Sequence, residues 1–133
     1  MISTFDDLLR AAREQAVPQR LLFVFAKAGV PEDATREQRE RYEAGVGGTL
    51  TPLMCVDKTP EELDSFDVLL EESRQFGQAW DIVFVAALSG IGTSSPSSAQ
   101  AQEPLRRMVE SIKGGAFSNY VPFDVHGQPV RFG

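Results

Sequence analysis

Apolar residues along this chain follow two patterns, uninterrupted runs of strand length and stripes at helical spacing. Continuous runs occupy 21–26 and 82–88, and a third apolar stretch covers 50–56. Runs that are apolar at every position are typical of strands buried on both faces of a sheet. The clearest helical stripe has apolar side chains at i, i+3, i+4, i+7 and i+11, namely Phe5, Leu8, Leu9, Ala12 and Ala16.

Start signals place further helices between the apolar runs. The segment 35–38 has the spacing of a capping box, and 59–62, which reads T-P-E-E, is a strong helix start. Pro104 leaves two starts open for the last helix, one near Ser97 and one near Glu103. The C-terminal residues predict strands that flank a turn in a hairpin.

The resulting order is α-β-α-β-α-β-α-β-β, with the hairpin strands at 120–125 and 129–132. Fully apolar strands separated by helices predict an α/β fold with a mostly parallel sheet covered by helices on both faces. The C-terminal hairpin would add an antiparallel edge to this sheet. No linker divides the sequence, so we predict a single α/β domain over residues 1–133.

Length and composition agree with one globular domain. The chain has 133 residues, of which 42% are hydrophobic and 24% are charged. Its longest apolar runs are far shorter than the roughly 20 residues that span a bilayer. The first residues, M-I-S-T-F-D-D, are acidic where a signal peptide would be basic. We therefore expect a cytoplasmic protein without a membrane partner.

Charge and cysteine content exclude several function classes. The net charge of −6 repels nucleic-acid phosphates, so we expect no nucleic-acid partner. Because Cys55 is the only cysteine, the chain cannot form an internal disulfide, a dithiol redox pair or a Cys-rich zinc site. The oligomeric state is left open.

The most informative segment is the Gly/Ser-rich stretch that follows the apolar run 82–88. In open α/β sheets, ligands bind beyond the carboxyl ends of the strands, where helix N-termini present free N–H groups to anions. The predicted parallel sheet would bring the ends of its first three strands to one edge. The sequence then predicts a site for a small anionic ligand formed by Lys27, Lys58, Ser89, Gly90, Gly92, Thr93, Ser94 and Ser95.

A purely structural interpretation of the same stretch is also open. The loop has neither the lysine of a phosphate-binding P-loop nor the full G-x-G-x-x-G dinucleotide pattern. In this interpretation, Gly90 and Gly92 turn the chain, and Ser95, Ser97 or Ser98 caps the next helix. We predict no cofactor and no metal site.

Few residues qualify for catalysis. Cys55 lies within an apolar stretch, where a cysteine more often packs than reacts. His126 lies in a predicted turn without a triad or metal-ligand spacing around it. Asp57 and Lys58 follow the strand of Cys55, and these three residues are the best candidates for a small enzyme.

Four segments together resemble a family of short uncharacterised bacterial proteins commonly labelled "ribonucleotide reductase subunit alpha". They are P-Q-R-L-L-F-V-F at 18–25, M-C-V-D-K at 54–58, W-D-I-V-F-V-A-A-L-S-G at 80–90 and V-P-F-D-V-H-G-Q-P-V at 121–130. The label implies reduction of ribonucleotides, which requires a radical-bearing cysteine and a reducing cysteine pair. This chain has Cys55 alone, so we expect the resemblance to supply no catalytic residue and no reductase activity.

The combined features favour a non-catalytic binding or regulatory module. Its partner would be a small anionic ligand at the Gly/Ser loop, or a protein that contacts the exposed Arg/Glu-rich helix after residue 35. The alternative is a small enzyme that uses Lys58, Asp57 or Cys55 near that loop. A structural or assembly role is a third possibility.

Overall fold

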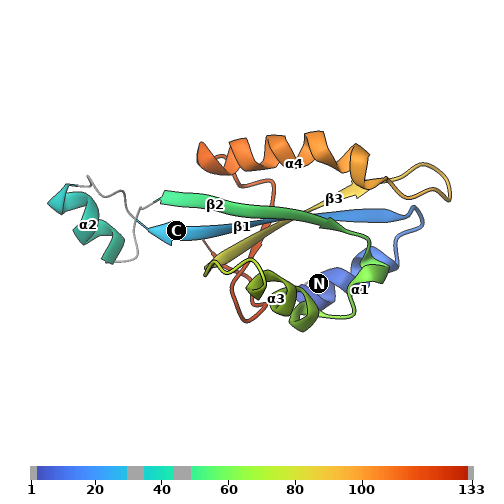
Figure 1. The fold of residues 1–133 in the computed structure, drawn as a ribbon, viewed down its shortest axis with the longest axis horizontal. Coiled ribbons are helices and arrows are strands. Elements are labelled where there is room, and N and C mark those ends of the chain that lie inside the picture. Colours follow the sequence, from blue (N-terminus) through green and yellow to red (C-terminus); the bar gives the residue numbers. More distant parts are fainter. Residues whose placement is uncertain (1–2, 30–34, 44–48, 132–133) are drawn as a thin grey trace.

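The computed structural model describes residues 3–29, 35–43 and 49–131. In chain order its elements are α1 (Phe5–Arg13), β1 (Gln19–Gly29), α2 (Arg36–Glu43), β2 (Thr49–Lys58), the short 3₁₀ helix η1 (Pro60–Glu62), α3 (Phe66–Arg74), β3 (Ile82–Ser89), α4 (Ser98–Lys113) and β4 (Val121–Phe123) (Figure 1). None of the helices in these ranges is long and apolar enough to cross a bilayer.

The four strands form one sheet in the order β2-β1-β3-β4, and every pair of neighbours is antiparallel. The predicted mostly parallel sheet, with its alternating α-β order, is therefore wrong. Continuous apolar runs indicate burial on both faces of a sheet, which holds for residues 21–26 of β1 and 82–85 of β3, and this burial does not depend on strand direction. β2 and β3 both lie antiparallel to β1 on its two sides, so these two non-adjacent strands run in the same direction.

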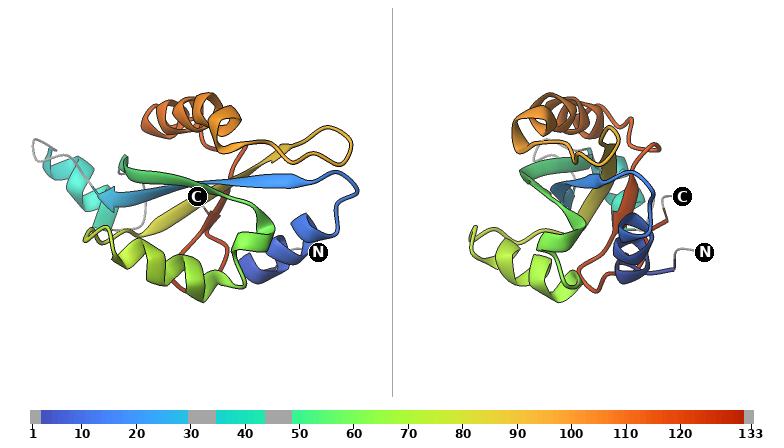
Figure 2. Two further views of the ribbon diagram at one scale, coloured as in Figure 1. Left: turned by 45° about the vertical axis from the view of Figure 1, so that its right-hand side comes forward. Right: turned by 90° about the vertical axis from the view of Figure 1, so that its right-hand side faces the viewer.

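Helices cover both faces of the sheet and enclose two separate cores. On one face, odd-numbered residues of β1 such as Phe23 pack with α1 and α3 around Phe5, whose ring is 5.1 Å from that of Phe66. On the other face, even-numbered residues of β1 such as Val24 pack against the apolar side of α4. Figure 2 shows α4 on one side of the sheet and α1 and α3 on the other. Because side chains alternate along β1, the strand contributes residues to both cores.

Side-chain caps mark the starts of α2 and α4. The capping box predicted at 35–38 is confirmed, because Thr35 Oγ1 accepts a hydrogen bond from the N–H of Gln38 at 3.1 Å. The start predicted at 59–62 produces only η1, and α3 begins at Phe66, where Asp6 Oδ1 accepts the backbone N–H at 2.9 Å. α4 begins after its N-cap residue Ser97 and includes Pro104.

The C-terminal hairpin is shorter than predicted. β4 covers only Val121–Phe123, and the chain then turns at 124–128, where the N–H of Asp124 donates to the carbonyl of Gln128 at 2.9 Å. The returning segment contacts β4 through an isolated bridge between Phe123 and Pro129. Residue 132, which the prediction included, lies outside the described residues.

Candidate functional site

The predicted site residues are only partly brought together. The start of β1 and the ends of β2 and β3 meet at one end of the sheet, since Gln19 pairs with Ser89 and Leu21 pairs with Lys58. Lys27 pairs with Thr51 towards the opposite end of β1. The explanation that parallel strand ends gather these residues is therefore wrong, and Lys27 lies apart from the Gly/Ser loop.

Lys58 lies at the same end of the sheet as the loop but on the other face. Its Nζ forms an ion pair with Glu72 of α3 at 3.0 Å. The Gly/Ser loop leads into α4, which covers the opposite face. Lys58 and the loop thus do not converge on one anion.

The glycines of the loop serve a tight turn. The backbone groups of Ile91 and Ser94 exchange two hydrogen bonds, of 3.1 and 3.0 Å, and Gly92 between them has a positive φ of 61°. A Cβ at Gly90 would lie 1.9 Å from the carbonyl oxygen of Ser94. The N–H of Gly90 is also used, since it donates to the carbonyl of Pro18 at 2.9 Å. This geometry matches the structural interpretation of the loop.

The serines of the loop region are used in structural contacts as well. Ser97 Oγ accepts the N–H of Gln100 at 3.1 Å, and the Gln100 carboxamide accepts the N–H of Ser97 at 2.8 Å. The hydroxyl of Ser89 shares hydrogen bonds with Gln19. Ser98 Oγ donates to Asp57 at 3.0 Å.

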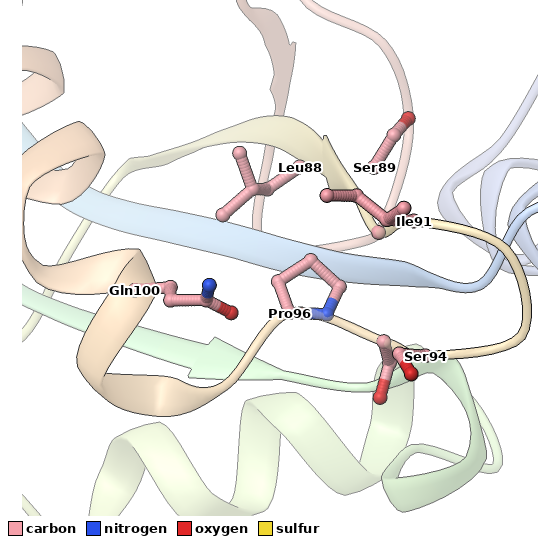
Figure 3. Close-up of a pocket in the computed structure, with 8 residues that line it drawn as sticks. Leu88, Ser89, Ile91, Ser94, Pro96 and Gln100 are labelled. Atoms are coloured by element: carbon pink, nitrogen blue, oxygen red, sulfur yellow. The ribbon is translucent and has the colours of Figure 1, made fainter.

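A hollow of about 240 Å³ lies beside this loop. Figure 3 shows Leu88, Ile91 and Pro96 along it, with the side chain of Gln100 reaching in from α4. The predicted residues Ser89, Gly90, Ser94 and Ser95 line it. Several backbone N–H groups of the loop and of the start of α4 are already bonded within the chain, namely those of Gly90, Ile91, Ser94, Ser97 and Gln100.

Arg20 is the cation that the structure brings to the loop, and it was not predicted from the sequence. Its Nε donates to the carbonyl of Pro96 at 2.6 Å, and its NH1 pairs with Asp57 at 2.6 Å. The two side chains are only 14% and 12% exposed, and Glu62 lies 4.0 Å from the guanidinium. The positive charge is therefore neutralised. A cation at the start of one apolar run and an acid at the end of another were the sequence signals for this pair.

The three catalytic candidates lie near one another without forming a reactive group. Cys55 is exposed on the edge strand β2, not packed as its apolar stretch predicted. Partial burial is the larger cause and the negative charge of Asp57 the smaller cause of a raised pKa of the Cys55 thiol. The raised pKa disfavours the nucleophilic thiolate. Asp57 pairs with Arg20 and Lys58 pairs with Glu72. All three candidates line an open hollow of about 500 Å³ that also includes Phe76.

Within the part of the chain that the structure describes, the His126 imidazole has no hydrogen bond or ion pair to a second catalytic group. The residue is exposed in the turn after β4, where its backbone N–H donates to Asp124 Oδ1 at 2.8 Å. Among the described residues, no group of three or more His, Cys, Asp or Glu side chains could hold a metal ion.

A groove of about 450 Å³ between α1 and the end of β3 was not predicted. The described residues that line it include no charged side chain; they are Leu8, Ala11, Ala12, Gln15, Gln19, Leu21, Val85, Ala86, Ala87, Asn119, Tyr120 and Val121. These residues come from four separate parts of the chain. Only the tertiary structure assembles them, so no local sequence signal could have revealed the groove.

The strand beside this groove has an incomplete partner. β3 continues to Ser89, whereas β4 pairs only with Val83–Val85. Among the described residues, the last residues of β3 therefore have a neighbour on the β1 side and no neighbouring strand on the β4 side.

Comparison with protein-family models, with curated proteins and with solved structures gave no match to this chain. The family resemblance noted in the sequence stays a prediction. Function is therefore inferred from the residues of this chain.

Proposed function

We propose that the protein is a cytoplasmic, non-catalytic binding module whose ligand is a segment of another polypeptide, held in the groove between α1 and β3. The observation that carries this proposal is the uncharged groove beside the unpartnered end of β3. Its apolar floor suits aliphatic side chains, and the carboxamides of Gln15 and Asn119 can hydrogen-bond to peptide groups.

The chemistry of the candidate catalytic residues supports a binding role over an enzymatic one. Asp57 and Lys58 are each held in an ion pair, and the raised pKa of the Cys55 thiol lowers the fraction of thiolate. A small enzyme built on these residues would first have to release them from these contacts. That requirement makes it the weaker candidate.

A small anionic ligand at the Gly/Ser loop is the other form of the binding hypothesis. It needs a cation and free N–H groups that point to one place. Lys27 and Lys58 lie elsewhere, and Arg20 is already paired with Asp57. The turn and cap hydrogen bonds use much of the loop backbone. The polypeptide ligand therefore has more support.

Selection from a random dodecapeptide phage library against the folded protein tests the proposal. Clones that bind the natural protein are tested against Ala87→Arg and Gln15→Arg, which place a charged side chain in the groove at exposed positions. Ala99→Arg is the matched control, because Ala99 is an exposed alanine of α4 on the other face of the sheet. Thermal unfolding of each variant checks that it is folded.

We expect enriched clones to bind the natural protein and the Ala99→Arg variant equally. Both groove variants should lose at least about 10-fold in affinity, because a bound peptide would bury the unpaired charge of the new arginine. Failure to enrich any clone, or binding unaffected by the groove variants, would overturn the proposal. An NMR titration with inorganic phosphate is run in parallel. Shifts of amides at 90–98 with millimolar phosphate would favour the anionic ligand instead.

A further inference from the structure

We infer that the partner segment binds in extended form, as an added strand hydrogen-bonded to Ala87 and Ser89 of β3, with an uncharged aliphatic side chain at every second position. This inference rests on the proposed function of the groove and specifies the chemistry of its ligand.

The direction of the β3 backbone groups follows from the ladder with β1. The N–H of Gly90 donates to the carbonyl of Pro18, which continues the register in which Gln19 faces Ser89. Backbone groups alternate in direction along an antiparallel strand. Even-numbered residues of β3 therefore bond to β1, and odd-numbered residues direct their N–H and C=O groups to the other side.

The β4 side gives the same result independently. The carbonyl of Pro122 accepts the N–H of Val130 at 3.1 Å, so Pro122 faces away from β3. Its neighbours Val121 and Phe123 then face β3, opposite Val85 and Val83. Odd-numbered residues of β3 thus bond to β4 as far as β4 extends.

Beyond Val85 this ladder stops, although β3 continues. The chain before β4 turns away, since the N–H of Tyr120 donates to the carbonyl of Phe117 at 3.2 Å. Within the described ranges, the outward N–H and C=O groups of Ala87 and Ser89 have no hydrogen-bond partner in the chain, and both residues are exposed. An extended peptide can satisfy these groups by continuing the sheet along the line of β4.

The groove determines which side chains such a strand would carry. Leu21 and Val85 pack in the core on the α1 side of the sheet, and Ala87 has the same parity as Val85. Alternate side chains of an added strand would therefore lie over these residues and against Leu8 and Ala12 of α1. Because no charged residue lines the groove, an ionised side chain would lose its hydration there without gaining a counter-charge. Aliphatic residues fit this environment.

The outer edge of β2 is less suited to the same interaction. It contains Pro52, which lacks an N–H, and the β1–β2 register shifts between Phe25 and Ala26, close to Pro52. Such interruptions are common devices that protect an edge strand from pairing. The end of β3 has neither feature, so strand addition is directed there.

The test uses a groove-dependent dodecapeptide from the library selection, synthesised with one N-methylated residue at a time. N-methylation removes a single backbone donor, so in an added strand every second position of the paired segment should lose at least about 10-fold in affinity, with the positions between within about 2-fold. In the same segment, replacement of alternate aliphatic residues by alanine should cost at least about 10-fold.

The outcomes separate this inference from the function on which it rests. Groove-dependent binding in which N-methylation is tolerated everywhere, or is harmful without a period of two, would overturn strand addition and leave the binding function intact. If no library peptide binds in the groove, the proposed function itself fails. Loss of affinity on N-methylation at alternate positions supports both strand addition and the proposed binding function.

Discussion

Gly90 and Gly92 lie two residues apart in the turn after β3, yet different constraints hold them. At Gly90 a Cβ would collide with the Ser94 carbonyl at 1.9 Å, whereas at Gly92 no atom lies within 4 Å and only the positive φ disfavours a side chain. We expect Gly92→Ala to cost about 1 kcal/mol and Gly90→Ala at least about 2 kcal/mol. Urea unfolding measures both. Equal costs would contradict the described turn.

Cys55 allows a test of electrostatics at a single residue. Burial and Asp57 raise the pKa of its thiol, so at pH 8 a smaller fraction is thiolate in the folded protein than in the unfolded chain. We expect the iodoacetamide reaction of the folded protein to reach half its maximal rate at a higher pH than that of the same chain in denaturant. The thiol is exposed, so it reacts without unfolding. An equal or lower midpoint would contradict this environment.

At the scale of elements, Arg20 and Asp57 join β1 and β2 to the segment that enters α4. Asp57→Leu takes the close partner from nearly buried Arg20, and the more distant Glu62 compensates only part of this loss, so the change should cost about 2–3 kcal/mol. Arg20→Met combined with Asp57→Leu should cost clearly less than the sum of the single changes. Ser98→Ala removes an exposed hydroxyl that donates to Asp57 and should cost at most about 1 kcal/mol. Additive costs for the pair would show that it is not coupled.

The N-terminus of α1 depends on the ionised form of Asp7. The backbone N–H groups of Ser3 and Thr4 donate to Asp7 Oδ2 at 3.0 and 3.2 Å, and the Ser3 bond is the main cause of the lowered pKa of this carboxyl. A lowered folded pKa gives stability that is present above the unfolded pKa and is lost as pH falls through the folded pKa. Asp7→Asn should therefore be less stable than the natural protein at pH 7. Thermal unfolding from pH 7 to pH 2 should show the difference closing, and a gap independent of pH would contradict the cap.

At the scale of the whole molecule, element positions were predictable and strand direction was not. The apolar run 82–88 and the helical stripe from Phe5 both specify burial, and burial locates β3 and α1 well. A strand covered on both faces shows the same run in either direction, so the sequence did not distinguish a parallel sheet from the antiparallel one. Pairing depends on contacts far apart in sequence.

The candidate site was likewise predictable only in its local features. The loop after β3 was located correctly at the strand end. Lys58 lies at the same end of the sheet because β2 and β3 both run antiparallel to β1. The face on which Lys58 lies, the pairing of Arg20 with Asp57 and the groove against α1 depend on tertiary packing alone. Local motifs contain no information about such contacts.

Amide hydrogen exchange along β3, measured by NMR with and without a library peptide, tests the binding function most directly. In the free protein we predict slow exchange at Ala86 and Leu88, which bond to β1, and fast exchange at Ala87, which faces the groove. Saturating peptide should slow exchange at Ala87 and Ser89 by at least about 10-fold and leave their even-numbered neighbours unchanged, because each new hydrogen bond adds protection. An Ala87 amide that is already protected in the free protein, or that is unaffected by bound peptide, would contradict the account.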